Sequence, residues 1–187
     1  MHNATLPNSF VRRLHWIVVA IVAFEFIVAW TMPEVRKNTI PGALLNVHMT
    51  FGAILLPFVL AFFSARFYRS TSEGEYVVQD TAWARKVSSM MYVALYTLLI
   101  LVPLTGWSFA STRGWTVTLF GTVDLPQLFA HSTVLGIRVD HMHSVLATVL
   151  GILILGHVAA ALYHHFVLKD ELLRSMLPRF LKLKTKE

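Results

Sequence analysis

The sequence predicts an all-α integral membrane protein: a four-helix bundle that forms one membrane domain over residues 1–187, with both termini in the cytoplasm. Hydrophobic residues make up 56% of the chain and charged residues only 14%, whereas charged residues are about 25% of an average soluble domain. Four windows of about 20 apolar residues are long enough to cross a bilayer as helices. The strand alternation of a membrane barrel is absent from the sequence, so helices must satisfy the backbone groups in the hydrocarbon.

The orientation is predicted from the distribution of positive charge. The outer side of the predicted bundle holds four of the 16 lysines and arginines, which leaves 12 for the side of the termini. These four residues are Arg36, Lys37, Arg113 and Arg138. Such an excess marks the cytoplasmic side of a membrane protein. It also accounts for the net charge of +6, so we expect no nucleic acid partner.

The first spanning helix is predicted at residues 12–32. The two arginines before it resemble the start of a signal peptide, but the apolar run is longer than usual and lacks a clear A-x-A cleavage site. His15 lies close to the cytoplasmic end of this helix, and Trp16 and Trp30 fit the interfacial belts. Glu25 is an ionisable group inside the span, which makes it a functional candidate. We favour a packed carboxyl, because nothing else in the sequence points at Glu25.

The second helix is predicted at residues 44–67, after a short outer loop. His48 lies near its outer end, and Gly52 lies one turn below on the same face, where a missing side chain would let a flat ring approach the backbone. Arg66 follows His48 by five full turns and shares that face at the cytoplasmic end. The third helix, predicted at 87–109, contains Pro103 and Gly106 but no histidine, and is expected to be scaffold that lines one side of a cofactor.

The fourth helix, predicted at 140–167, follows a long outer loop (110–139) that we expect to cover the bundle; a loop of this length is often functional. It contains two histidines, His143 and His157, separated by 13 uncharged residues. The helix rise places them roughly 21 Å apart along the axis and on nearly the same face. His141 points about 160° away from His157, so His143 is preferred. A basic amphipathic tail (168–187) suits the anionic inner leaflet.

Because successive helices run in opposite directions, the predicted depth of each histidine in the membrane shows which histidines can form pairs. His15 and His157 lie toward the inside and His48 and His143 toward the outside, although His15 is closer to the interface than His157. Pairs of imidazoles from facing helices are a natural way to clamp a haem in a bundle. The absence of cysteine excludes a covalently attached c-type haem, disulfides and iron–sulfur clusters. A cysteine-free, carboxylate-poor site also argues against catalytic zinc or di-iron, and the open alternatives are histidines in helix–helix hydrogen bonds and a transporter.

Four segments of the chain resemble the bacterial cytochrome b561 family. They are LHW at 14–16, NVHMTFG at 46–52, LVPLTGW at 101–107 and HSVLATVLGILILGHVAAALYHHFVLKD at 143–170. Members of this family are small four-helix di-haem cytochromes of the bacterial inner (plasma) membrane. The resemblance covers nearly the whole chain. It implies two b-type haems, with His15 and His157 as ligands of the inner iron and His48 and His143 as ligands of the outer iron.

Within this family the resemblance is strongest to the enterobacterial member that acts as a superoxide oxidase. That enzyme takes an electron from superoxide at the periplasmic side and passes it through the haems to ubiquinone. By this resemblance His164 falls at the quinone end, and Arg66 matches a basic position of the family. One departure is that relatives often carry a histidine near the start of helix three, where this chain has Ser89 and Tyr92.

We therefore expect a transmembrane electron conduit in the lipid bilayer, a superoxide:ubiquinone oxidoreductase with ubiquinone as substrate or bound acceptor. Bis-histidine ligation closes both axial positions, so the irons should exchange electrons rather than bind oxygen. Arg113 and Arg138 are candidates for attracting superoxide or for holding haem propionates, and their alternative role is interfacial anchoring. The rival functions are an electron-transfer subunit that serves a partner dehydrogenase or redox protein donor, and a non-redox membrane protein with structural histidines.

Overall fold

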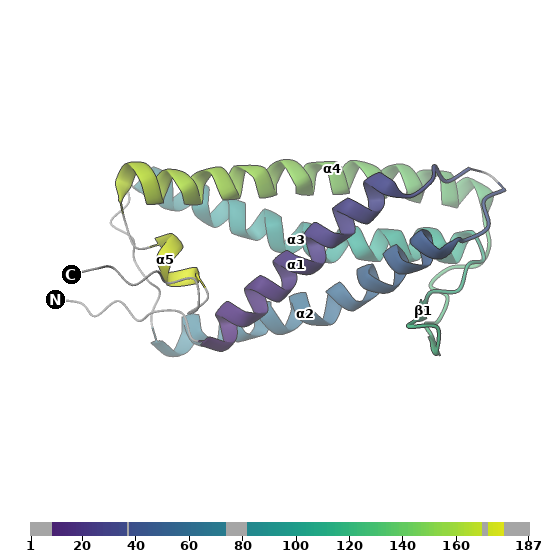
Figure 1. Cartoon of the computed structure of the whole chain (residues 1–187), viewed down its shortest axis with the longest axis horizontal. Helices are drawn as coiled ribbons and strands as arrows, with labels where there is room; N and C mark the ends of the chain where they lie inside the picture. Colours follow the sequence, from purple (N-terminus) through teal and green to yellow (C-terminus); the bar gives the residue numbers. More distant parts are fainter. Residues whose placement is uncertain (1–8, 37, 74–81, 170–171, 178–187) are drawn as a thin grey trace.

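The computed structural model describes residues 9–36, 38–73, 82–169 and 172–177 of the chain, which form a bundle of four long helices (Figure 1). In chain order the helices are α1 (Ser9–Thr31), α2 (Ala43–Glu73), α3 (Ala82–Thr112) and α4 (Thr133–Tyr163). Each of these four contains an apolar window long enough to cross a membrane. The predicted fold class, an all-α membrane four-helix bundle, is confirmed.

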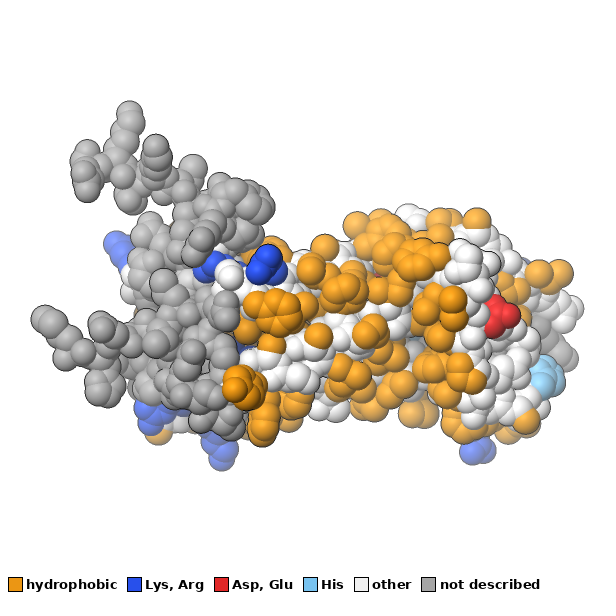
Figure 2. Space-filling view, turned by 90° about the horizontal axis from the view of Figure 1, so that it is seen from below, with side chains coloured by type: hydrophobic (Ala, Val, Ile, Leu, Met, Phe, Trp, Pro, Cys, Tyr) orange, Lys and Arg blue, Asp and Glu red, His pale blue; other side chains and the backbone are white. Residues whose placement is uncertain are grey.

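The surface of the bundle is apolar along most of its length. Ile27, Ile152 and Leu155 are each more than half exposed, at 57%, 62% and 71%. Figure 2 shows hydrophobic side chains spread along the body of the molecule, whereas Lys and Arg side chains gather mainly toward one end. A monomeric soluble protein rarely exposes so large an apolar surface, and this surface is suited to contact with lipid tails.

The buried core is thin, and α1 crosses the bundle obliquely to form it (Figure 1). Near its start α1 packs on α2, where Leu14 and Phe62 are buried together. The second half of α1 lies toward the end of the bundle that the sequence predicts to be the outer one. There α1 reaches α4, where the ring of Phe26 lies 3.5 Å from the position that a Cβ would take on Gly151. This oblique path leaves the space between the outer halves of the helices open for the site described below.

The fourth helix begins at Thr133, earlier than the predicted start at 140. Ser132 is its N-cap: its side chain accepts a hydrogen bond from the N–H of Leu135 at 3.3 Å, which satisfies one of the free donors of the first turn. Gly136 faces the end of α3, where a Cβ would lie 3.1 Å from the hydroxyl oxygen of Thr112. The outer connection is therefore shorter than the predicted loop 110–139, and the ends of α3 and α4 are held together.

The helices α2 and α3 are also longer than the predicted spans, 44–67 and 87–109. Both helices continue past their apolar windows, so the length of the hydrophobic run underestimates the length of the helix. The connection between α3 and α4 contains a short antiparallel hairpin of β1 (Thr118–Leu119) and β2 (Val123–Asp124). The sequence pattern does not predict this hairpin. The hydroxyl of Thr50 donates a hydrogen bond to the carbonyl of Thr118 at 2.9 Å, so the hairpin rests on the outer end of α2.

The end of the described chain returns to the start of α1. A π-helical turn, η1 (His164–Leu168), continues α4 and ends at Lys169, whose φ is 54°. A short helix, α5 (Leu172–Met176), then lies beside α1: the guanidinium of Arg12 donates to the carbonyl of Ser175 at 3.4 Å, and the indole of Trp16 donates to the carbonyl of Met176 at 2.7 Å. Most of the predicted basic tail, 168–187, lies outside the described residues.

Candidate functional site

A cavity of about 430 Å³ opens between the outer halves of all four long helices. Its lining is mainly apolar, with Val22 and Phe26 from α1, Leu55 from α2 and Leu150 from α4. The polar side chains that line it include Glu25, His48, Asp140 and His143. A mostly apolar pocket of this size with a few convergent polar groups is typical of a cofactor site.

His48 and His143 face one another across this cavity from α2 and α4. Their ring centroids are 6.1 Å apart and the ring planes are inclined by 76°. Two imidazoles that bind one metal ion at about 2 Å, with each ring centre about 1 Å further out, have centroids about 6 Å apart. The pair that the sequence matches by depth therefore has the spacing of two axial ligands of one ion.

The helix α3 fixes the ring of His143. The Nδ1 atom of His143 lies 3.0 Å from the carbonyl oxygen of Val102 and 3.3 Å from the hydroxyl oxygen of Thr105. A carbonyl can only accept, so Nδ1 carries the proton and donates, which leaves the lone pair of Nε2 available to a ligand or metal. The ring also fills the space above Gly106, where a Cβ would lie 3.0 Å from Cε1 of His143.

The sequence predicts α3 as scaffold that lines one side of a cofactor, but it does not predict the contact of α3 with His143. The signal for this contact is the glycine at position 106, which leaves room for a ring on a neighbouring helix in the middle of a span. A glycine in a helix interior is destabilising by about 0.5–1 kcal/mol relative to alanine, so close packing is the physical reason to expect one there.

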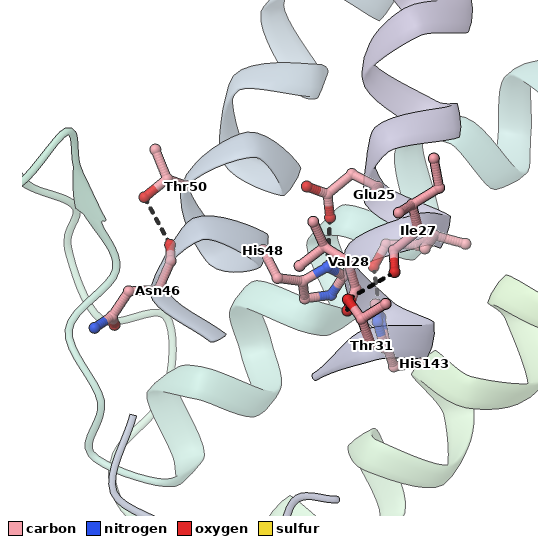
Figure 3. A network of polar contacts seen from close by, with 9 residues as sticks. Glu25, Ile27, Val28, Thr31, Asn46, His48, Thr50 and His143 are labelled. Carbon is pink, nitrogen blue, oxygen red and sulfur yellow. Dashed lines mark hydrogen bonds and ion pairs between the residues drawn. The ribbon is translucent and has the colours of Figure 1, made fainter. Parts of the chain in front are cut away.

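The other outer histidine is oriented from α1. The Nδ1 atom of His48 lies 2.5 Å from Oε2 of Glu25, and Figure 3 shows the carboxylate reaching from α1 toward the ring of His48, with His143 nearby. Gly52, predicted to admit a flat ring, lines the cavity, and a Cβ on it would lie 3.8 Å from Oε2 of Glu25. The space above Gly52 is therefore shared between the cavity and the Glu25 carboxylate.

The inner histidines lie at the other end of the bundle, among aromatic side chains. The ring of His15 lies 5.7 Å from that of Phe62, and it is close enough to His157 and Arg66 to interact with both electrostatically. The ring of His157 lies 6.2 Å from that of Tyr92. Arg66 in turn lies over Tyr92, with its guanidinium carbon 5.2 Å from the ring centroid. Of the predicted inner residues, Arg66 and His157 therefore contact Tyr92, one of the two positions that depart from the family pattern.

The remaining histidines of α4 and η1 differ in their surroundings. His141 is exposed and does not line the outer cavity, which agrees with the preference for His143. His164 is half-buried at the start of η1, with its ring 6.4 Å from that of Tyr163. A π-helical turn is rare and is frequently found at functional sites.

Arg113 and Arg138, the two arginines proposed to attract superoxide, do not line the cavity. Arg113 donates a hydrogen bond to the carbonyl of Arg36 at 2.6 Å, and its guanidinium carbon lies 4.9 Å from the ring centroid of Trp115. It therefore ties the two outer connections together. Arg138 is exposed on the first turns of α4. The charged residues that do line the outer part of the cavity are acidic, Glu34 and Asp140.

Within the described part of the chain, no three His, Asp or Glu side chains come together as a metal-binding group. Two potential ligands, His48 and His143, instead approach one another as a pair of imidazoles. A structural zinc site takes four protein ligands, whereas the iron of a haem takes its equatorial ligands from the porphyrin and needs only axial ligands from the protein. The donor set and the cavity between His48 and His143 therefore fit a haem.

Comparison with known proteins identifies similar chains over nearly the whole length. A model of the family described as prokaryotic cytochrome b561 matches residues 8–179. Cytochrome b561 homolog 1 of Escherichia coli (strain K12) is 28% identical over 169 residues, which cover 89% of this chain and 93% of that protein. Cytochrome b562 of Cereibacter sphaeroides is 28% identical over 173 residues, 89% of this chain and 92% of that protein. A probable superoxide oxidase, CybB of Yersinia pestis, is 25% identical over 169 residues, 89% of this chain and 92% of that protein.

Proposed function

The chain belongs to the prokaryotic cytochrome b561 family, haem-binding electron-transfer proteins of bacterial membranes, and from this premise we propose that it is a di-haem superoxide:ubiquinone oxidoreductase. Two superoxide anions each lose one electron and leave as O₂. Ubiquinone takes the two electrons and two protons and becomes ubiquinol. Each haem supplies an iron that accepts and releases one electron. The similarity to the probable superoxide oxidase of Yersinia pestis supports this activity.

The observation that carries the proposal is the distance of 6.1 Å between the ring centroids of His48 and His143. These residues would hold the outer haem from α2 and α4, in a cavity with an apolar lining that excludes water. His15 and His157 would hold the inner haem, and the nearby Arg66 would balance negative charge at that end. His164 lies at the end of α4 on the same side, where it would face the quinone.

The orientation supports electron flow toward the cytoplasmic side. The start of α1 and helix α5 lie at one end of the bundle, which is the end where the sequence concentrates lysine and arginine. By the positive-inside rule this end is cytoplasmic. The outer pair, His48 and His143, then lies toward the periplasm of a bacterial inner membrane, and the inner pair lies toward the cytoplasmic leaflet.

A second candidate function is an electron-transfer subunit of a partner dehydrogenase. Glu34 and Asp140 line the outer cavity, whereas Arg113 and Arg138 do not. An acidic opening repels a small anion such as superoxide and suits a neutral donor or a basic protein surface. A stable complex with a dehydrogenase in mild detergent, together with no reaction with superoxide, would favour this function.

The first test is a pyridine-haemochrome assay with a reduced-minus-oxidised spectrum of the purified protein. We expect two b-type haems per chain and a low-spin spectrum. The variant His143→Leu should carry one haem, and the matched variant His141→Leu on the same helix should keep two. Addition of superoxide should then reduce ubiquinone in the wild type. Protein from haem-replete cells without haem would contradict the proposal, and two haems without superoxide-driven reduction would leave the subunit function.

A further inference from the structure

Glu25 places a carboxylate in the middle of a membrane-spanning helix, against the outer histidine pair. The side chains of Glu25 and His48 are only 11% and 19% exposed, and Oε2 of Glu25 lies 2.5 Å from Nδ1 of His48. Apart from this contact, Nδ1 of His48 and Oε1 of Glu25 are buried and have no hydrogen-bond partner among the described residues. The close contact between the two side chains is therefore what compensates their burial in a site of low polarity.

The surroundings of Glu25 offer this carboxylate little other compensation. Its neighbours on α1 that line the cavity, Val22 and Phe26, are apolar. On α2, Gly52 has no side chain and so leaves room for the carboxylate of Glu25. A Cβ on Gly52 would lie 3.8 Å from Oε2 of Glu25. An ionisable side chain inside a membrane span is costly and almost always has a partner or a function. The partner of Glu25 is His48.

The contact determines which nitrogen of His48 is left for a metal. Because the carboxylate lies against Nδ1, the atom free to bind is Nε2. His143 has the same arrangement, with Nδ1 directed at a backbone carbonyl, that of Val102. The two rings differ in the partner itself: a carboxylate is a stronger acceptor than a neutral carbonyl. An acceptor on the second ring nitrogen fixes the orientation of a ligand histidine and raises its basicity.

We propose that Glu25 is a positioning residue for the outer haem: it orients His48 through Nδ1, makes its Nε2 a stronger donor to iron and thereby favours the ferric state. This inference rests on the proposed function, because it requires that His48 and His143 hold a haem. The outer haem would then be held by one histidine that contacts a carboxylate and one that contacts a peptide carbonyl. We expect the reduction potential of this haem to be lower than that of a haem held by two histidines that both donate to backbone carbonyls.

The test compares Glu25→Gln and Glu25→Ala with the wild type. The midpoint potentials of both haems are measured by spectroelectrochemical titration, and the ferric low-spin signals by electron paramagnetic resonance. Glutamine keeps the size of the side chain and offers Nδ1 of His48 a neutral amide oxygen, which is a weaker acceptor than the carboxylate. Alanine removes the acceptor. We expect the potential of the outer haem to rise from wild type to Gln to Ala. The reduction constant should change about tenfold or more in Glu25→Ala, which is about 59 mV for a one-electron couple.

Two controls separate this effect from a general one. The inner haem, held by His15 and His157, serves as an internal reference and should keep its potential. Asp124→Asn removes a carboxylate from β2, where Asp124 accepts a hydrogen bond from Thr118 at 2.8 Å and does not line the cavity, and should leave the outer potential unchanged. The single-haem variant His143→Leu identifies which spectral signal belongs to the outer haem.

Unchanged potential and resonance signals of the outer haem in both Glu25 variants would overturn the inference and leave Glu25 as a packed carboxyl. Loss of both haems in both variants would also overturn it, since Glu25 would then support the fold rather than one ring. Loss of the outer haem in Glu25→Ala with a shifted outer potential in Glu25→Gln would support it. A wild-type protein without an outer haem would instead refute the proposed function, before any variant is made.

Discussion

At the scale of single residues, the outer histidine pair depends on side chains and backbone groups that bind no metal. His143 is positioned by the carbonyl of Val102 and the hydroxyl of Thr105, and His48 by Glu25. Each contact engages Nδ1, so both rings leave Nε2 for a ligand bond. Outer contacts of this kind typically change metal affinity or activity by about 10–100-fold when they are removed.

Gly106→Ala should weaken the outer haem site selectively. The added Cβ would lie 3.0 Å from Cε1 and 3.2 Å from Nδ1 of His143, so the ring must move and its contact with Val102 must lengthen. Overpacking of this kind costs about 1–3 kcal/mol. We expect partial loss of one haem per chain in the haemochrome assay and a shifted spectrum of the haem that remains at the outer site.

The control for this variant is Gly151→Ala on α4. Its added Cβ would lie 3.5 Å from the ring of Phe26, an ordinary contact distance, so both haems should be kept. Full haem content and an unchanged spectrum in Gly106→Ala would show that His143 tolerates the displacement. The close packing of α3 against that ring would then be unimportant for cofactor binding.

At the scale of helices, the cap of α4 sets the position of two ligand candidates at once. Ser132 caps the helix that carries both His143 and His157. Ser132→Ala should destabilise the protein by about 1 kcal/mol, because it removes the acceptor for the N–H of Leu135. Ser132→Asp, which keeps an acceptor, should restore most of this stability. Thermal loss of haem absorbance in detergent measures both, and equal midpoints for Ser132→Ala and the wild type would contradict the assigned cap.

The π-helical turn after α4 gives a test of the quinone end. Quinone reduction consumes protons, and a histidine can supply them with an effect of about 10²–10⁴-fold on the rate. His164→Ala should therefore slow ubiquinone reduction at least tenfold while both haem spectra remain intact. His165→Ala, the neighbouring residue of the same turn, is the matched control and should react at the wild-type rate. Loss of a haem in His164→Ala would indicate a structural role, and an unchanged rate would place quinone elsewhere.

The sequence predicts what depends on one helix at a time. Helix rise and direction are enough to match His48 with His143 by depth and to separate His143 from the exposed His141. Contacts between helices depend on how each helix is rotated about its axis and on the angles at which the helices cross. The residue pattern of one helix does not determine either quantity. For this reason the sequence assigns Glu25 to packing and α3 to the lining of a cofactor, but it predicts neither the contact of Glu25 with His48 nor that of Val102 with His143. The early start of α4 is likewise not predicted, because two charged residues, Arg138 and Asp140, interrupt the apolar residues at this end of the helix.

At the scale of the whole molecule, the charges are arranged along the axis of the bundle. Lysine and arginine gather mainly toward one end of the space-filling view (Figure 2), and the apolar body separates that end from the outer connections. A C-terminal fusion to green fluorescent protein should therefore fluoresce in intact cells, and a C-terminal alkaline phosphatase fusion should be inactive. The reverse pattern would mean that the outer pair faces the cytoplasm, and the proposed direction of electron flow would be wrong.

The reaction with superoxide gives a test of the electrostatics of the outer end. If Arg113 and Arg138 attract the anion, the second-order rate constant should fall several-fold as ionic strength rises, since the Debye length shortens from about 30 Å at 0.01 M to about 3 Å at 1 M. Arg138→Gln should lower the rate at low salt and flatten this dependence. Arg13→Gln, at the opposite end of the bundle, should change neither. Rapid mixing with superoxide, followed by haem absorbance, measures these rates.

The opposite salt dependence would be equally informative. A rate constant that rises with ionic strength would mean that Glu34 and Asp140, which line the outer cavity, dominate the local field and repel the anion. Screening would then relieve a repulsion instead of weakening an attraction. A small anion would be a poor physiological donor for such an opening. The favoured donor would be a neutral molecule or a basic protein surface, and the chain would serve as the membrane subunit of a partner that delivers electrons to His48 and His143.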